Sequence, residues 1–333
     1  MNRMRAKFLC IALSTLTKFF SARNTQRIIS ILLAGSLLSV WPQECRAADK
    51  LIAAIMSSDQ PRYREAHRAF VRSVAARGYP PTTTEIILQV PDSDQLSWSN
   101  TVRKLNAYKP DLIVAYGAPA ALSAMRESSG APVVSVDIYT GEQPVKGMCG
   151  VSSRVPIITL LKALKDIRPF RNIGIIYSSR ESGSQRQRDD IRMLALQLGV
   201  GVTEINAATS TALDYGLATI IEHSDVVFAT ESYIVSRNFE RIIARTRPHN
   251  IPVAATMPDA AIKGALVSLE INPQEQGYLA AEIAVRLLEG ATPDHLPLLT
   301  PRRIDLTVNL RLAREMGLSV PFSVLGNATR IIK

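Results

Sequence analysis

Short apolar runs alternate with amphipathic stretches along most of the chain. Each run has six or seven residues and is bounded by turn residues, as is typical of strands that are buried on both faces. The runs occupy residues 51–56, 85–90, 111–116, 132–138, 172–178, 201–206, 225–231, 251–256, 265–270 and 304–309. Between them, stretches such as residues 63–78 and 275–290 repeat apolar residues three and four positions apart, the spacing of one helix face. This alternation predicts parallel sheets built from β-α-β units.

The runs form two series, separated by residues 139–156, which are rich in Gly, Pro and Ser and lack a clear period. With 333 residues, of which 47% are hydrophobic, the chain is large enough for two ordinary cores. We therefore predict an α/β fold with two doubly wound parallel-sheet lobes in place of one giant sheet. Residues 139–156 are the predicted first crossing between the lobes.

The first 47 residues are typical of an export leader. Basic residues at 23–27 precede an apolar run at residues 28–41, and small residues follow. Cys45 and Ala47 fit the small positions before a signal-peptidase site, so we predict cleavage after Ala47 and a periplasmic protein that begins at Ala48. The apolar run has fourteen residues, fewer than the roughly 20 that span a bilayer, although a retained anchor is the alternative. We expect no stable membrane insertion.

Cleavage changes the charge of the chain. The leader holds 7 of the 39 Lys and Arg residues and 1 of the 29 Asp and Glu residues, so that 32 and 28 remain and the balance falls from +10 to +4. The densest basic stretch, residues 180–192, has acids mixed into it and is typical of a solvated helix face. No basic stripe with interleaved aromatic residues follows the leader, so we expect no nucleic-acid partner. Cys149 alone remains after cleavage, which excludes an intramolecular disulfide.

Patterns typical of catalytic and cofactor sites are missing from the sequence. The four histidines are isolated, and no cysteine pairs with any of them in ligand spacing. The phosphate-binding patterns GxGxxG and GxxxxGK[ST] do not follow any strand, and GxSxG is absent. We therefore expect no cofactor, no metal and no catalytic residues, and a protein that is not an enzyme.

Small and polar residues instead occupy the carboxyl ends of the predicted strands, where open α/β sheets place their ligands. The candidate ligand-binding residues are Ser57, Ser58, Tyr116, Gly117, Ala118, Asp137, Ser178, Ser179 and Glu231. Ser58 is alternatively a helix cap, and Glu231 is alternatively a first-turn acid favoured by the helix dipole. Tyr116, Tyr139 and Tyr233 either pack on an aromatic ligand or are ordinary core or surface residues.

One helix start raises a particular expectation. The helix that opens at Ala118-Pro119 has no Ser, Thr, Asp or Asn in the position of its cap. Because backbone N–H groups and the helix dipole favour an anion there, we expect the carboxylate of a ligand to occupy this site. The alternative is that water or a side chain from a distant loop satisfies these groups.

The closing segment, IDLTVNLRLAREMGLSVP, carries a family resemblance. A strand leads into the pattern N-L-x-x-A-x-x-x-G-L and a proline, and the matching residues are Asn309, Leu310, Ala313, Gly317, Leu318 and Pro321. The preceding helix, with Gly277 and its terminal Gly290, and the segment PDLIVAYGAPAAL match as well. The chain resembles ABC-transporter substrate-binding proteins of the tryptophan/tyrosine-binding type.

This resemblance implies a type I periplasmic-binding fold, in which two lobes are joined by three crossings and close on a small ligand. The crossings are expected near Ser153, Ile271 and Thr300. The N-terminal lobe then comprises residues 48–153 and 271–300, and the C-terminal lobe comprises residues 154–270 and 301–333.

The implied function is that of an exported, monomeric solute-binding protein which delivers its ligand to an ABC permease and ATPase complex. An amino-acid-like zwitterion is the favoured ligand, since Asp137 or Glu231 can meet its ammonium group. Two alternatives remain open at this stage: a periplasmic module that presents its ligand to a membrane sensor, and an enzyme acting in the cleft.

Overall fold

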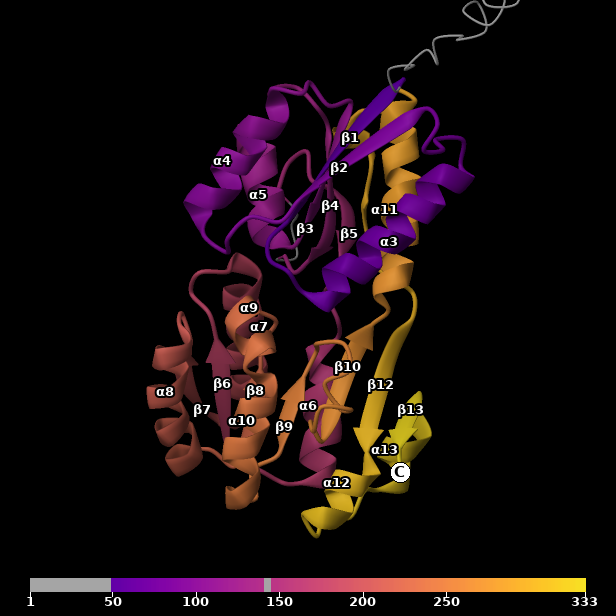
Figure 1. Cartoon of the computed structure of the whole chain (residues 1–333). Coiled ribbons are helices and arrows are strands. Elements are labelled where there is room, and N and C mark those ends of the chain that lie inside the picture. The colour runs from indigo at the N-terminus through magenta and orange to yellow at the C-terminus, as the bar shows by residue number, and fades with distance from the viewer. Residues whose placement is uncertain (1–48, 141–144) are drawn as a thin grey trace, which may run out of the picture. The chain divides into compact units, whose positions relative to one another are not determined.

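The structure, a computed structural model, describes residues 49–140 and 145–333. The predicted leader and its cleavage site lie outside the described residues. Within the described residues, two separate sheets are present, with strand orders β11-β5-β4-β3-β1-β2 and β13-β12-β10-β9-β8-β6-β7. Figure 1 shows the two sheets and the helices that cover them. The predicted α/β architecture with two lobes is confirmed.

All strand pairs of the first sheet are parallel. Its strands are β1 (Lys50–Met56), β2 (Thr84–Gln89), β3 (Leu112–Tyr116), β4 (Val133–Ile138), β5 (Cys149–Ser152) and β11 (Leu298–Leu299). Its helices are α3 (Pro61–Ala76), α4 (Gln95–Asn106), α5 (Ala118–Glu127) and α11 (Pro273–Leu288). Side chains of β1 alternate between the two faces: Ile52 and Ala54 join a core with α3 and α11, whereas Ala53 and Ile55 join a core with α4 and α5. We call this sheet with its four helices the first lobe.

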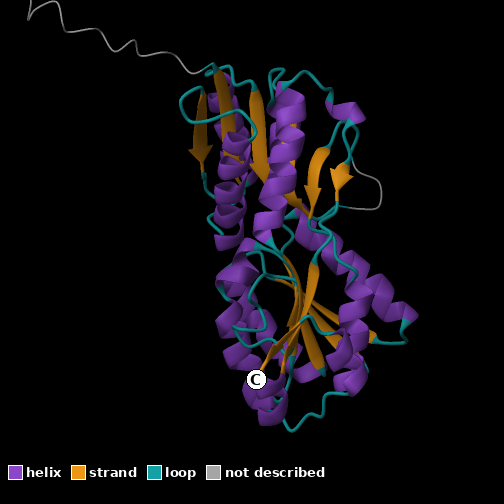
Figure 2. Cartoon of the chain, turned by 90° about the vertical axis from the view of Figure 1, so that its right-hand side faces the viewer, coloured by secondary structure: helices purple, strands orange, loops and turns teal. Residues whose placement is uncertain are grey.

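The second sheet is parallel except for the antiparallel pair β10–β12. Its strands are β6 (Asn172–Tyr177), β7 (Gly201–Asn206), β8 (Val226–Ala229), β9 (Val253–Ala255), β10 (Val267–Ile271), β12 (Ile304–Asn309) and β13 (Arg330–Ile332). The helices that accompany it are α6 (Ile157–Ile167), α7 (Ser182–Gln197), α8 (Ser210–His223), α9 (Tyr233–Arg237), α10 (Phe239–Thr246), α12 (Leu310–Glu315) and α13 (Phe322–Asn327). Two 3-10 turns, η1 (Arg247–His249) and η2 (Pro293–His295), complete the described elements. The second sheet and its helices form the second lobe, and helices lie on both of its faces (Figure 2).

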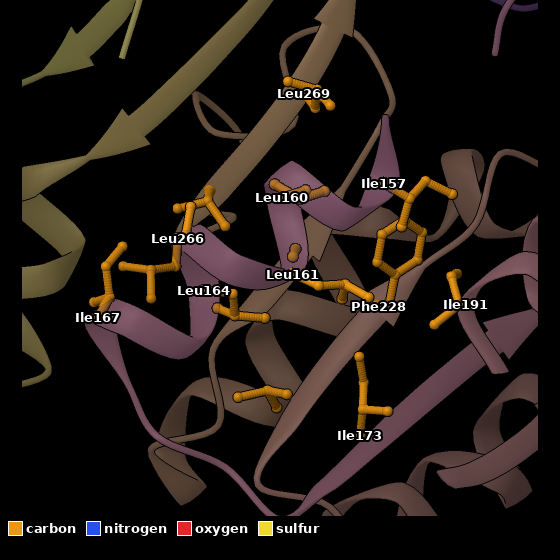
Figure 3. Close-up of a cluster of buried hydrophobic side chains, with 14 of the residues drawn as sticks. Ile157, Leu160, Leu161, Leu164, Ile167, Ile173, Ile191, Phe228, Leu266 and Leu269 are labelled. Atoms are coloured by element: carbon orange, nitrogen blue, oxygen red, sulfur yellow. The ribbon is translucent and has the colours of Figure 1, made fainter. Parts of the chain in front are cut away.

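The larger core of the second lobe lies between its sheet and helix α6. Leu160, Leu161 and Leu164 of α6 pack around Phe228 of β8, which is fully buried (Figure 3). A sheet covered on both faces needs apolar side chains on both sides of each strand. This requirement explains why continuous apolar runs, and not alternating ones, marked these strands in the sequence.

The chain passes between the two lobes three times. It leaves the first sheet after β5, returns to it after β10 through helix α11, and leaves it again after β11. Helix α11 then packs along α3 at close range, because Gly277 has no side chain. A Cβ atom at Gly277 would lie 2.2 Å from the carbonyl oxygen of Ala66. The paired helices hold the start of α3 at the boundary between the lobes, where the site described below is formed.

Candidate functional site

Residues that follow the strands of both sheets meet in a narrow cleft of about 20 Å³ between the lobes. The first lobe and the segment that leaves it supply Arg62, Tyr63, Ala118, Asp137, Tyr139 and Ser153, and the second lobe supplies Glu181, Gly183, Ser184 and Glu231. Three of the predicted ligand-binding residues, Ala118, Asp137 and Glu231, therefore line the same cleft. Arg62 and Glu181 also line it and were not among the predicted residues.

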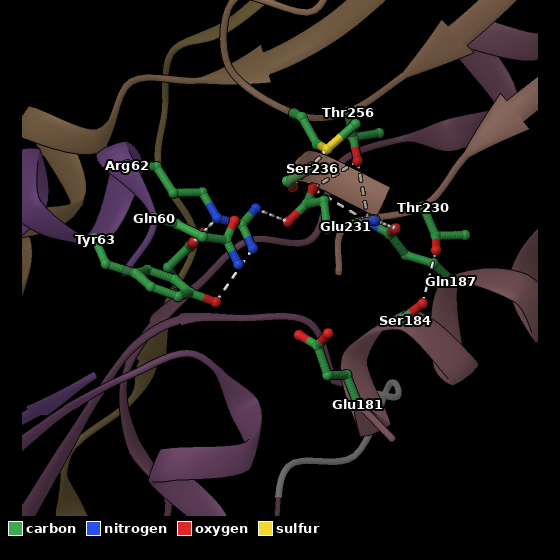
Figure 4. A network of polar contacts seen from close by, with 12 residues as sticks. Gln60, Arg62, Tyr63, Glu181, Ser184, Gln187, Thr230, Glu231, Ser236 and Thr256 are labelled. Carbon is green, nitrogen blue, oxygen red and sulfur yellow. Dashed lines mark hydrogen bonds and ion pairs between the residues drawn. The ribbon is translucent and has the colours of Figure 1, made fainter. Parts of the chain in front are cut away.

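The side chain of Arg62 lies at the centre of the site and bridges the lobes. It is the second residue of α3, and only 9% of it is exposed. Its Nη1 lies 2.5 Å from Glu231 Oε2 in the second lobe, and its Nε lies 3.1 Å from Asp137 Oδ2 in the first. Its Nη2 donates a hydrogen bond of 3.2 Å to the Tyr63 hydroxyl. Figure 4 shows the guanidinium between the Tyr63 hydroxyl and the Glu231 carboxylate.

Glu231 is held in place from within the second lobe. Its Oε1 accepts hydrogen bonds from Thr256 Oγ1 at 2.5 Å and from Gln187 Nε2 at 3.1 Å. Its backbone N–H donates to Gln187 Oε1 at 2.7 Å. Burial raises the pKa of Glu231, against the opposing effect of the Arg62 charge. The carboxyl group is thus held by contacts from its own lobe, and the Arg62 guanidinium is its charged partner.

Asp137 is held from within the first lobe. It is the last residue but one of β4. Its φ is +57°, a left-handed conformation that costs energy for a residue other than glycine. Gln276 of α11 donates to its Oδ1 at 2.8 Å. Its Oδ2 is within ion-pair distance of Arg62 Nε, yet neither atom has a hydrogen bond of acceptable geometry. One oxygen of this buried carboxylate is therefore left without a well-aligned donor.

Glu181 places a third carboxyl group on the cleft. It precedes α7, and its Oε1 accepts a hydrogen bond of 2.7 Å from the backbone N–H of Tyr233. Burial raises the pKa of Glu181 to about 7, which the hydrogen bond and the Arg62 charge oppose. Its carboxyl group points toward the space in front of Tyr63 and Ser184 (Figure 4).

The structure contradicts the expected uncapped helix start. Ser57 Oγ accepts a hydrogen bond of 3.0 Å from the N–H of Ala120 at the start of α5, and it donates one of 2.9 Å to the Tyr116 carbonyl. The cap therefore comes from a distant loop, which was the alternative reading. Gly117 has φ = +85°, and a Cβ atom there would lie 2.5 Å from the Tyr63 hydroxyl. Because Ser57 and Tyr63 fill this position, an anion is not needed to satisfy the Ala120 N–H.

The other predicted residues lie beside the cleft and have partners within their own lobes. Ser58 Oγ accepts from Gln60 Nε2, and the Tyr116 hydroxyl pairs with His67 Nδ1. Ser178 donates its N–H to Ser184 Oγ, and Ser179 Oγ accepts from the side chain of Asn206. None of these four lines the cleft.

A second cavity, of about 80 Å³, lies on the other side of Arg62. Its walls include Glu65 from α3 and Met257, Asp259 and Lys263 from the loop after β9. Arg62 lines both cavities and separates them. Within the described ranges, the cleft included, no group of three or more His, Cys, Asp or Glu side chains could hold a metal ion. Nor does any helix in those ranges have the length and apolar character needed to cross a bilayer.

Comparison with protein families identifies the chain. The model of the ABC transporter substrate binding protein family matches residues 53–332. The chain belongs to this family. It is a family of solute-binding proteins and not of enzymes. The resemblance seen in the closing segment of the sequence is thereby confirmed.

Several relatives of this substrate-binding protein have been characterised. A tyrosine-binding protein from Clostridioides difficile is 22% identical over 313 residues, which cover 86% of this chain and 91% of the relative. A Streptococcus pneumoniae ABC domain solved with L-Trp is 21% identical, with a TM-score of 0.80 over 86% of this chain and all of that one. A ligand-free, open substrate-binding protein with adhesive properties from Clostridium difficile is 23% identical, with a TM-score of 0.64 over 85% of this chain and 99% of that one. These structures confirm the type I periplasmic-binding fold.

Proposed function

We propose that this substrate-binding protein captures a small organic ligand with an ammonium group in the cleft between its lobes and delivers it to an ABC permease and ATPase complex. An amino-acid-like zwitterion is the favoured ligand. The proposal rests on one observation: buried carboxylates from opposite lobes, Asp137 and Glu231, converge on a single cationic group. A cation held from both sides favours the closed arrangement of the lobes, because its contacts with one lobe are lost when they separate.

The relatives suggest which amino acids to try first. One is named for tyrosine and another was solved with L-Trp, and the cleft contains the aromatic rings of Tyr63 and Tyr139. We therefore propose L-tyrosine and L-tryptophan as the first probes. The proposed working form is a monomer in the periplasm that starts at Ala48, and N-terminal sequencing of the exported protein tests that start site.

Thermal unfolding with added amino acids tests the ligand proposal. A ligand that binds only the folded protein adds about 2.7 kcal/mol at 100 times its Kd, which raises the Tm by several degrees. In Glu231→Gln the carboxylate charge is lost, so affinity should fall about tenfold to a hundredfold. Glu222→Gln is the matched control, because Glu222 is an exposed acid in α8, with 75% of its side chain accessible. Equal affinity in the two variants would refute the role of Glu231.

A further inference from the structure

Arg62 occupies a position in the cleft that a ligand would be expected to take. Its guanidinium lies between two buried carboxylates and is their charged partner from within the chain. We propose that this guanidinium occupies the position that the cationic group of the ligand takes when it binds. The site then selects organic cations, and a ligand does not need a carboxylate. The inference rests on the proposed function in that the cleft is the ligand site, and it changes the favoured ligand from a zwitterion to an organic cation.

The charges of the cleft favour a ligand with a net positive charge. The groups lining the cleft that can carry a charge near neutral pH are the guanidinium of Arg62 and the carboxyl groups of Asp137, Glu181 and Glu231. Even with Glu181 protonated, one negative charge is left without compensation in a buried place, and such a charge is costly. With Arg62 displaced into the neighbouring cavity, an amine or guanidine without a carboxylate restores the positive charge that Arg62 removes. A zwitterion or an anion leaves Asp137 and Glu231 with more uncompensated negative charge.

Two buried acceptors in the cleft remain for the ligand's donors. Asp137 Oδ2 and Ser153 Oγ are both inaccessible to solvent and have no hydrogen-bond partner among the described residues. Both residues line the cleft and are more than nine-tenths buried. The guanidinium of Arg62 lies close to Asp137 without pointing an N–H at this oxygen. An ammonium group has three donors and can serve acceptors that the fixed fork of a guanidinium misses.

The side chain of Arg62 can rotate into the neighbouring cavity when a ligand enters. The neighbouring cavity is lined by Arg62 itself, by the carboxyl groups of Glu65 and Asp259, and by the ammonium group of Lys263. Rotation of the long side chain toward the two carboxyl groups vacates the space between Asp137 and Glu231. The ring of Tyr63, whose centroid is 4.9 Å from the Arg62 guanidinium carbon, is left to face the incoming cation.

Calorimetric titration with three related probes tests this inference. L-tyrosine has both charged groups, tyramine has only the amine, and 3-(4-hydroxyphenyl)propanoate has only the carboxylate. We expect tyramine to bind at least as tightly as L-tyrosine, and the acid to bind about a hundredfold more weakly or not at all. This comparison needs the wild-type protein alone. Binding of the acid as tight as that of the amine would overturn the inference.

A variant pair tests the competition by Arg62. Arg62→Met keeps an unbranched, flexible side chain and removes the guanidinium charge, so tyramine should bind about tenfold or more tightly. Arg64→Met is the control, because Arg64 is in the same helix, is half-exposed and pairs with Asp59 on the surface. It should leave the affinity unchanged, and circular dichroism checks that both variants fold. Weaker tyramine binding in Arg62→Met would show that Arg62 assists the ligand, contrary to the inference.

The outcomes separate the inference from the proposed function. If L-tyrosine binds and tyramine binds neither protein, the inference is wrong and the proposed amino-acid ligand stands. If tyramine binds and L-tyrosine does not, the inference is supported and the amino-acid ligand is withdrawn. If none of the three probes binds either protein, both the inference and the proposed ligand class are rejected.

Discussion

Glu181 should make the stability of this protein depend on pH near neutrality. Its carboxyl group is 7% exposed, and burial raises its pKa from the ordinary 4.5 to about 7. In the unfolded chain the group loses its proton near pH 4.5, whereas in the folded protein it keeps the proton to about pH 7. Between these values the folded state binds more protons, so stability falls as the pH rises and levels off above pH 7.

The size of the effect follows from the shift. A shift of about 2.5 pKa units at 1.36 kcal/mol per unit corresponds to about 3 kcal/mol, of which about 2.5 kcal/mol falls between pH 5 and pH 8. Glu181→Gln removes the titration and keeps an amide oxygen that can accept the Tyr233 N–H. The variant should therefore gain stability over the wild type as the pH rises.

Urea unfolding at pH 5 and pH 8 measures this difference. Because both proteins share every other titrating group, the change in their stability difference between the two pH values reports Glu181 alone. We expect the free energy of unfolding of Glu181→Gln, relative to wild type, to rise by about 2.5 kcal/mol from pH 5 to pH 8. A relative change below about 0.5 kcal/mol would show that Glu181 stays ionised in the fold, and the reasoning from burial would fail.

Two further substitutions test how the site is positioned. Gly277→Ala puts a methyl group 2.2 Å from the Ala66 carbonyl oxygen, between α3 and α11, and should lower the free energy of unfolding by about 3 kcal/mol or more. Gly326→Ala is the control, because nothing lies within 4 Å of the added methyl group, and it should leave the stability nearly unchanged in the same urea assay. Ser57→Ala removes the cap of α5 and should lower the free energy of unfolding by about 1–2 kcal/mol; unchanged stability would mean that another group satisfies the Ala120 N–H.

Most of the fold could be predicted because its strands are buried on both faces. All ten predicted strands are present, and their ends differ by at most two residues. Strands β5, β11 and β13 were missed. β5 has four residues and contains Gly150, so that it looked like the irregular crossing, and β11 has only two residues. Such short strands exist because a neighbouring strand pairs with them. Gly150 of β5 and Leu298 of β11 pair although they lie 148 positions apart, and such a pairing leaves no local signal.

The rule that ligands bind at strand ends found part of the site. It placed Asp137 and Glu231 correctly on the cleft, since their positions follow directly from the strands before them. It missed Arg62, which lies in the first turn of α3 and not at the end of a strand. Its burial depends on Glu231, 169 positions away. A cation in the first turn opposes the helix dipole, and this conflict was the one local signal that Arg62 has a special partner.

The three crossings also set the order in which the molecule can be completed during synthesis. The last strand of the first sheet, β11, begins at Leu298, long after β5 ends at Ser152. At about 5–20 residues per second, the ribosome needs roughly 7–30 s to make the chain between them. For that time the first lobe lacks both its edge strand and helix α11, whose close fit against α3 closes its core. The nascent chain is thus kept from early completion, which would suit the export proposed above.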